Sequence, residues 1–137
     1  MFDNDRTGAA ATAETVLVVE DDVLVRLVIA GYLRDCGYRV LEAASADEAV
    51  RLLQRGEAQV DVVLTDVEMP GEMDGFALSQ WVRRERPDLE VVMAGTPARA
   101  ANAAGELCEQ GPAGSRPLDP SAVLARIRRL LAMRHRR

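Results

Sequence analysis

Two short apolar runs that each end in carboxylates constrain this fold more than any other feature. The run Val16–Val19 is followed by three acids at positions 20–22, and the run Val60–Thr65 is followed by Asp66. Short runs rich in valine and leucine are typical of buried strands in a parallel sheet. The carboxyl ends of parallel strands meet at one edge, where open α/β sheets bind ligands. We therefore expect these acids to lie close together.

A cluster of like charges is costly unless a cation neutralises it or one member is protonated. Hard divalent cations prefer carboxylate, carbonyl and water oxygens, which this edge would supply. The pattern predicts a divalent-metal site beside a carboxylate that can act as a nucleophile, and Asp66 is the candidate. Simpler interpretations remain: Asp66 as a solvated loop acid, and Asp22 as a helix N-terminal acid that the helix dipole favours.

The rest of the chain alternates strand-like and helix-like segments, which indicates a parallel sheet with helices on both faces. The expected strands are Thr15–Val19, Tyr38–Glu42, Val60–Thr65, Leu89–Ala94 and, on weak grounds, Ala113–Ser115. The expected helices cover 23–36, 45–54, 74–86 and 97–111, and a last helix begins at Asp119-Pro120. Capping residues and the stops Gly37, Gly56 and Pro87 support these limits. The prediction is an α/β fold with a doubly wound, five-stranded parallel sheet.

Size and composition predict one folded domain. The 137 residues suffice for a core of small aliphatic side chains, and the net charge of −5 argues against a general nucleic-acid-binding surface. We expect residues 1–14 to be a disordered leader, residues 15–133 the folded domain and residues 134–137 an Arg-rich tail. Neither a signal peptide nor a membrane span is apparent, so a cytoplasmic location is expected. Cys36 and Cys108 lack metal or redox spacing and are interpreted as ordinary core or near-surface thiols.

Several short motifs of this chain together resemble those of a known protein family. Val16–Asp22 followed by a helix, Asp66-x-x-Met69-Pro70 and Asp74-Gly75 resemble the receiver domain of two-component response regulators, over roughly Thr15 to Met133. The resemblance implies a (βα)5 flavodoxin-like receiver fold. It also implies that Asp66 accepts a phosphoryl group from a histidine kinase or a histidine phosphotransfer protein.

The resemblance further implies Mg²⁺ at the acid cluster. Glu20, Asp21 and Asp66 would hold the ion, Asp21 directly and Glu20 through water, and the backbone carbonyl of Glu68 would complete the protein ligands. The physical logic agrees, because a carboxylate that attacks phosphorus needs its own charge and that of the phosphoryl oxygens offset.

Three positions depart from the family pattern. Where the family has Ser or Thr after the fourth strand, this chain has Gly95, with Thr96 one residue later as a possible displaced hydroxyl. Arg116, before Pro117, stands in place of the family lysine, and all 17 basic residues of the chain are arginine. The aromatic switch residue of the family would fall at Ala113. We therefore hypothesise an altered readout of phosphorylation, in which the region around the fourth helix becomes ordered.

The sequence favours a single-domain response regulator that signals by protein–protein interaction or acts as a phosphate sink, rather than an enzyme. The alternative is a phosphorylation-independent pseudo-receiver that only binds partners. A magnesium-dependent phosphatase with Glu68 as general acid is a further rival, although no substrate cap is apparent. The arginines near the C-terminus could suggest DNA contact, but a solvated helix face explains them and no direct DNA binding is expected. A homodimer is possible, and the downstream partner is unknown.

Overall fold

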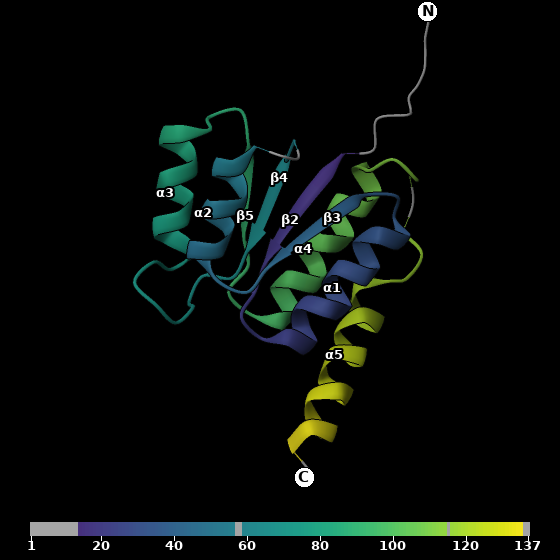
Figure 1. The fold of residues 1–137 in the computed structure, drawn as a ribbon. Helices are drawn as coiled ribbons and strands as arrows, with labels where there is room; N and C mark the ends of the chain where they lie inside the picture. Colours follow the sequence, from purple (N-terminus) through teal and green to yellow (C-terminus); the bar gives the residue numbers. More distant parts are fainter. Residues whose placement is uncertain (1–13, 57–58, 115, 136–137) are drawn as a thin grey trace, which may run out of the picture.

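The computed structural model describes residues 14–56, 59–114 and 116–135 of the chain. These residues form one parallel sheet between two layers of helices (Figure 1). The strands are β2 (Thr15–Val19), β3 (Arg39–Ala43), β4 (Val62–Thr65) and β5 (Glu90–Met93), in the order β3-β2-β4-β5. Each of these strands confirms a strand expected from the sequence to within two residues at either end. The expected leader lies almost wholly outside the described residues.

Side-chain caps fix where most of the helices begin. The helices are α1 (Val23–Asp35), α2 (Ala46–Arg55), α3 (Gly75–Glu85), α4 (Pro97–Gln110) and α5 (Pro120–His135). Side-chain oxygens of Asp22, Ser45, Asp74 and Thr96 each accept a backbone N–H in the first turn of the helix that follows. Such caps satisfy donors that the helix itself leaves unpaired, which stabilises each helix by about 1 kcal/mol. The simpler interpretation of Asp22, as a helix N-terminal acid, is confirmed.

The two faces of the sheet bury different sets of helices. Val16 and Val18 of β2 point to the face covered by α1, α4 and α5, whereas Leu17 and Val19 point to the face covered by α2 and α3. This alternation follows from the two-residue period of a strand. The sheet is therefore doubly wound, as expected, and α4 packs beside α1.

The five-stranded sheet expected from the sequence is wrong for the described residues, which contain four strands. The weak candidate Ala113–Ser115 does not form a strand where it is described: residues 112–113 form a turn, Gly114 has a φ of 71°, and Ser115 lies outside the described part. Pro112 offers no backbone donor, and no β-branched side chain lies in the segment 111–114. Consequently β5 forms an edge of the sheet.

The interpretation of the two cysteines as ordinary thiols is also wrong. Cys36 and Cys108 form a disulfide, with their Cα atoms 5.3 Å apart. Cys36 is the C-cap of α1 and Cys108 lies in the last turn of α4, so the pair forms only because α4 packs on the same face as α1. Their sequence separation of 72 gives no local signal of this proximity.

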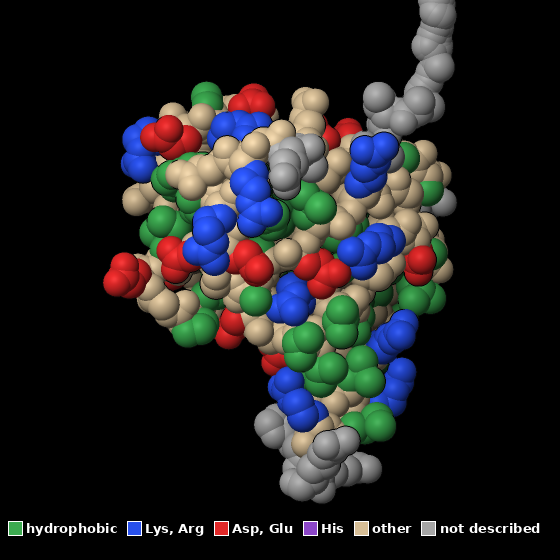
Figure 2. Space-filling model, in the orientation of Figure 1, with side chains coloured by type: hydrophobic (Ala, Val, Ile, Leu, Met, Phe, Trp, Pro, Cys, Tyr) green, Lys and Arg blue, Asp and Glu red, His purple; other side chains and the backbone are tan. Residues whose placement is uncertain are grey.

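Helix α5 lies along α1 and is attached to it near both ends. The hydroxyl of Tyr32 donates to the carbonyl of Leu118 at 2.6 Å, and Arg134 forms an ion pair with Asp22 at 2.9 Å. Between these contacts the two helices border a groove of about 400 Å³. Figure 2 shows hydrophobic side chains gathered on the surface over this region. Leu27, which lines the groove, is 52% exposed. No helix in the described ranges is long and apolar enough to span a membrane.

Gly75 fixes how closely α3 approaches the strand-end acid. Its N–H donates to the carbonyl of Val67 at 2.9 Å, and a Cβ on Gly75 would lie 2.1 Å from the carbonyl oxygen of Asp66. A side chain at position 75 would therefore force the backbone of α3 away from that of Asp66. Gly75 is thus a conformational requirement of the site.

We predict that Gly75→Ala lowers the free energy of unfolding by about 1–3 kcal/mol or more, because overpacking forces the backbone apart. The matched control is Gly31→Ala in the middle of α1, where a Cβ would meet nothing within 4 Å. Alanine there should stabilise the helix by about 0.5–1 kcal/mol. Urea unfolding measures both changes, and equal effects of the two variants would contradict the prediction.

Candidate functional site

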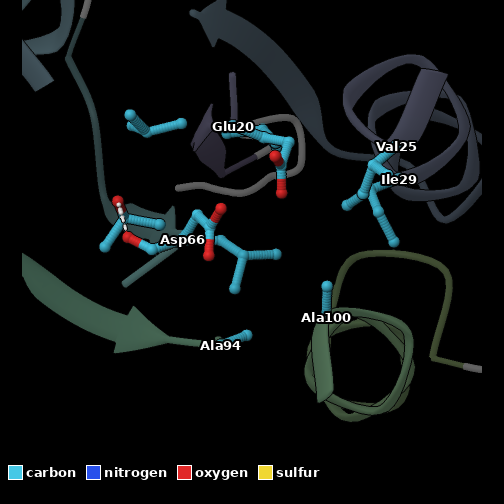
Figure 3. Close-up of a pocket in the computed structure, with 10 residues that line it drawn as sticks. Glu20, Val25, Ile29, Asp66, Ala94 and Ala100 are labelled. Atoms are coloured by element: carbon cyan, nitrogen blue, oxygen red, sulfur yellow. Dashed lines mark hydrogen bonds between the residues drawn. The ribbon is translucent and has the colours of Figure 1, made fainter. Parts of the chain in front are cut away.

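The acids predicted to cluster do lie together at one edge of the sheet. Glu20, Asp21 and Asp66 each offer a carboxylate oxygen, and these oxygens lie within 4.8 Å of one another. Strands β2 and β4 pair in parallel with Val19 opposite Thr65, which brings the residues after them to the same level. Figure 3 shows the carboxylates of Glu20 and Asp66 on facing sides of one small pocket.

The donor set fits a small divalent cation. Oxygens bound to Mg²⁺ lie about 2.0–2.1 Å from the ion, so two of them are separated by about 3 to 4 Å. The spacing of the three carboxylate oxygens comes close to this range, and all three donors are hard oxygens. A bound Mg²⁺ would remove the repulsion between like charges that the edge otherwise imposes. Glu68 lies beside the cluster in sequence, and its side chain is exposed.

The electrostatics of the metal-free site show that repulsion. Burial raises the pKa of Glu20 to about 8, and the nearby charges of Asp66 and Asp21 act in the same direction. The N–H of Asp22 opposes this shift by donating to Oε2 of Glu20 at 3.0 Å. Burial also raises the pKa of Asp66, against the N–H of Val67, which donates to its Oδ1 at 2.8 Å. A proton or a cation must therefore share this site near neutral pH.

Apolar side chains from α1 and α4 close the other side of the pocket. Val25 and Ile29 come from α1 and Ala100 from α4, as Figure 3 shows. Thr65 also lines the pocket, and its hydroxyl donates to the carbonyl of Asp66 at 2.9 Å. Thr65 was not singled out from the sequence, because a threonine inside a strand carries no distinguishing signal.

The positions after β5 place no hydroxyl in the lining of the pocket. Ala94 is the residue of this segment that lines it. A Cβ on Gly95 would instead lie 3.3 Å from Cγ2 of Val67. Thr96 caps α4, where its Oγ1 accepts from the N–H of Arg99 at 3.1 Å. Thr96 keeps its hydroxyl hydrogen for donation, so its role at the phosphoryl site stays a prediction.

The structure does not bring Arg116 to the acid cluster. Its Cδ would lie 3.6 Å from a Cβ on Gly105 of α4. Burial raises the pKa of Tyr32, and the charge of Arg116 partly opposes that shift. Tyr32 is ten residues beyond Asp22, about 15 Å along the helix at 1.5 Å per residue.

Two other arginines lie near the acids. Arg26 donates through Nη1 to the carbonyl of Glu20 at 2.8 Å and pairs through Nε with Glu42 at 3.2 Å. Arg134, expected in a tail, lies in α5, and its ion pair with Asp22 lowers the pKa of that carboxyl. Neither arginine was identified from the sequence as a neighbour of the acids. In the case of Arg134, the contact joins residues 112 positions apart.

Comparison with known proteins defines the class of this fold and site. The family model of the response regulator receiver domain matches residues 16–128. The chain belongs to this family, and the resemblance inferred from its motifs is confirmed.

Two relatives are similar in sequence to part of this chain. The sensor kinase CckA of Brucella abortus is 41% identical over 88 residues, which cover 64% of this chain and 9% of the kinase. The two-component response regulator ARR11 of Arabidopsis thaliana is 38% identical over 89 residues, 65% of this chain and 17% of that protein. The chain thus matches only a small part of the length of either protein.

Solved structures share the fold. The chemotaxis response regulator CheY4 of Vibrio cholerae superposes with a TM-score of 0.57 at 28% identity, over 86% of this chain and 98% of that one. TrrA of Thermotoga maritima in complex with Mg(2+)-BeF gives 0.55 at 27% identity, over 59% and 68%. A complex of TrrA with the histidine kinase ThkA gives 0.53 at 26% identity, over 59% and 67%.

We predict that the metal-free protein loses stability as pH rises from about 4.5 to about 8, because Glu20 is protonated in the folded state over a range where it ionises in the unfolded chain. A raised carboxyl pKa contributes stability that is complete below the unfolded pKa and is lost as pH passes the folded one. Added Mg²⁺ should reduce this loss, since the ion favours the ionised acids.

Thermal unfolding in chelator and in Mg²⁺, across this pH range, measures the effect. Glu20→Gln should flatten the pH dependence in chelator, whereas Glu68→Gln, at an exposed side chain close by, should not. A metal-free protein that becomes steadily more stable over this range would show that Glu20 is not protonated when folded.

Proposed function

We propose that this chain receives a phosphoryl group on Asp66 from a histidine kinase or histidine phosphotransfer protein, in a reaction that depends on Mg²⁺. The observation that carries the proposal is the convergence of Glu20, Asp21 and Asp66 at the edge shared by β2 and β4. Membership of the receiver-domain family and the fold shared with a regulator crystallised with Mg(2+)-BeF support it.

In the proposed reaction a carboxylate oxygen of Asp66 forms a bond to phosphorus while the phosphorus–nitrogen bond of a phosphohistidine breaks. Mg²⁺, when bound, neutralises charge on the carboxylates and the phosphoryl oxygens. Glu20 and Asp21 would hold the ion with Asp66 and the backbone carbonyl of Glu68. Thr65 fixes the backbone of Asp66 through its hydroxyl, and the apolar wall limits the access of water.

The proposal leaves Arg116 outside the phosphoryl site, because its side chain lies beside Gly105 of α4 and does not line the pocket of Asp66. The cluster then relies on Mg²⁺ for charge compensation. Gly95 removes the family hydroxyl, and Thr96 is the hydroxyl nearest in sequence that could replace it.

The biological role we propose is that of a cytoplasmic signalling module rather than an enzyme. It would act by binding another protein or by draining phosphoryl groups from a kinase. The alternative is a pseudo-receiver that binds partners without phosphorylation, and the departures at Gly95 and Arg116 favour it. The acid cluster opposes this alternative, since the two partly buried carboxylates of Glu20 and Asp66 would destabilise a mere scaffold.

Intact mass after incubation with acetyl phosphate and Mg²⁺ tests the proposal. Wild type should gain one phosphoryl group, whereas Asp66→Asn and wild type in chelator should gain none. An adduct on the Asp66→Asn variant would identify a different acceptor. The absence of any adduct from both acetyl phosphate and a phosphorylated histidine kinase would establish the pseudo-receiver.

We further propose that the kinase docks on the exposed apolar part of α1 next to the acid edge. Val23 and Leu27 are 46% and 52% exposed there, within a turn or two of Asp22. Leu27→Asp should slow phosphotransfer from a kinase by roughly tenfold or more, as expected when a buried interface anchor becomes charged. Phosphorylation by acetyl phosphate, which needs no docking, should be unchanged.

The matched control is Leu118→Asp, at a leucine 48% exposed that lies near the opposite end of α1. It should leave both reactions near wild type. Equal slowing of phosphotransfer by both leucine variants would argue against a docking face at the acid end of α1.

A further inference from the structure

The disulfide between Cys36 and Cys108 joins the C-terminal ends of the two helices that close the Asp66 pocket. Both sulfur-bearing side chains are fully buried. Cys36 caps α1 and Cys108 lies in the last turn of α4. At the other ends of the same helices, Val25 of α1 and Ala100 of α4 line the pocket of the phosphoryl site. One covalent bond therefore links the two helices that face this site.

Noncovalent contacts around the disulfide hold the end of α4 on the turn between α1 and β3. The hydroxyl of Tyr38 donates to the carbonyl of Leu107, and the N–H of Ala113 donates to the carbonyl of Cys36 at 3.2 Å. Gly111 packs so closely on the ring of Tyr38 that a Cβ there would lie 2.7 Å from it. The segment expected to form a fifth strand is instead part of this attachment.

The remainder of α4 is weakly anchored. Its buried face consists mainly of small residues: Ala100, Ala101, Ala104 and Gly105 precede Leu107 and Cys108. Dispersion contacts scale with the number of atoms that meet, so an alanine face holds a helix less firmly than a leucine face. The position of α4 therefore depends strongly on the attachment at its C-terminal end.

Helix α4 itself connects this attachment to the proposed phosphoryl site. Ala100 and Cys108 lie eight residues apart on one continuous helix, about 12 Å at 1.5 Å per residue. A helix of this length moves as a unit, so loosening its C-terminal end also loosens the wall that Ala100 forms beside Asp66. The cap residue Thr96 would move with it.

We propose that Cys36 and Cys108 are a reversible redox pair, and that their disulfide holds α4 against α1 and so keeps the pocket at Asp66 closed to water. The effect on the phosphoryl group rests on the proposed function, whereas the effect on α4 does not. With the disulfide formed, α4 is protected and a phosphoryl group on Asp66 is long-lived. With both thiols free, α4 opens more often and the phosphoryl group is hydrolysed faster.

The chemistry is thiol–disulfide exchange with a small-molecule disulfide such as oxidised glutathione. One protein thiolate attacks and releases one glutathione thiolate, and the second protein thiolate then displaces the other. Two protein thiols become one disulfide while one glutathione disulfide becomes two thiols, and reduced glutathione reverses the steps. Access to the buried sulfur atoms requires local opening of α4, whose small-residue face holds it weakly.

Amide hydrogen exchange across α4 tests whether the Cys36–Cys108 disulfide holds this helix, and it needs no phosphorylation. Wild type equilibrated with oxidised glutathione should exchange in residues 100–110 at least roughly tenfold more slowly than wild type in reduced glutathione. The Cys36→Ala/Cys108→Ala variant should match reduced wild type in both buffers, and so should the Cys36→Ser variant. Alkylation followed by intact mass reports two free thiols or none in each sample.

Three results would overturn the proposal: equal exchange of α4 in the two wild-type samples, two free thiols after oxidation, or a disulfide that the native protein retains in excess reduced glutathione. The decay of the phosphorylated wild type, followed by mass, should be faster in the reduced sample than in the oxidised one and independent of buffer in the alanine variant. If Asp66 takes no phosphoryl group, the proposed function fails while hydrogen exchange still decides the redox pair.

Discussion

The cost of holding three carboxylates together, two of them partly buried, is the constraint on which the rest of this structure depends. Parallel pairing of β2 with β4 forces Glu20 and Asp66 to the same level of one edge, and burial makes their ionised forms costly. A fold that keeps such a group intact at neutral pH must supply a proton or a cation there. Mg²⁺ would serve that purpose and would also prepare Asp66 for the proposed attack on phosphorus, so structural need and proposed chemistry coincide.

Helix α4 packs on the same face of the sheet as α1 and α5. Because no strand forms between α4 and α5 in the described residues, β5 is left at the sheet edge and α4 packs beside α1. This packing brings Cys108 to Cys36 and Ala100 to the pocket of Asp66. Arg116 lies beside Gly105 of α4 and does not line the pocket of Asp66.

The acid edge could be predicted from the sequence because its causes are local: short valine-rich strands followed at once by carboxylates. Helix limits were predicted for the same reason, since Ser45 and Asp22 cap the turns directly after them. The disulfide and the Arg134–Asp22 pair could not be predicted, because each depends on which face α4 and α5 cover. That choice is made by packing between segments far apart in the chain, which no local pattern encodes.

Fluorine NMR of beryllofluoride binding tests the central claim most directly, because it reports Mg²⁺ and the acceptor carboxylate together without requiring hydrolysis or a kinase. Wild type should show bound fluorine resonances only when Mg²⁺ is present. Asp66→Asn should show none, and Glu20→Gln should show them only at much higher Mg²⁺ concentration. Bound resonances that persist in Asp66→Asn, or that form equally well in chelator, would contradict the account of a magnesium-dependent phosphoacceptor at this edge.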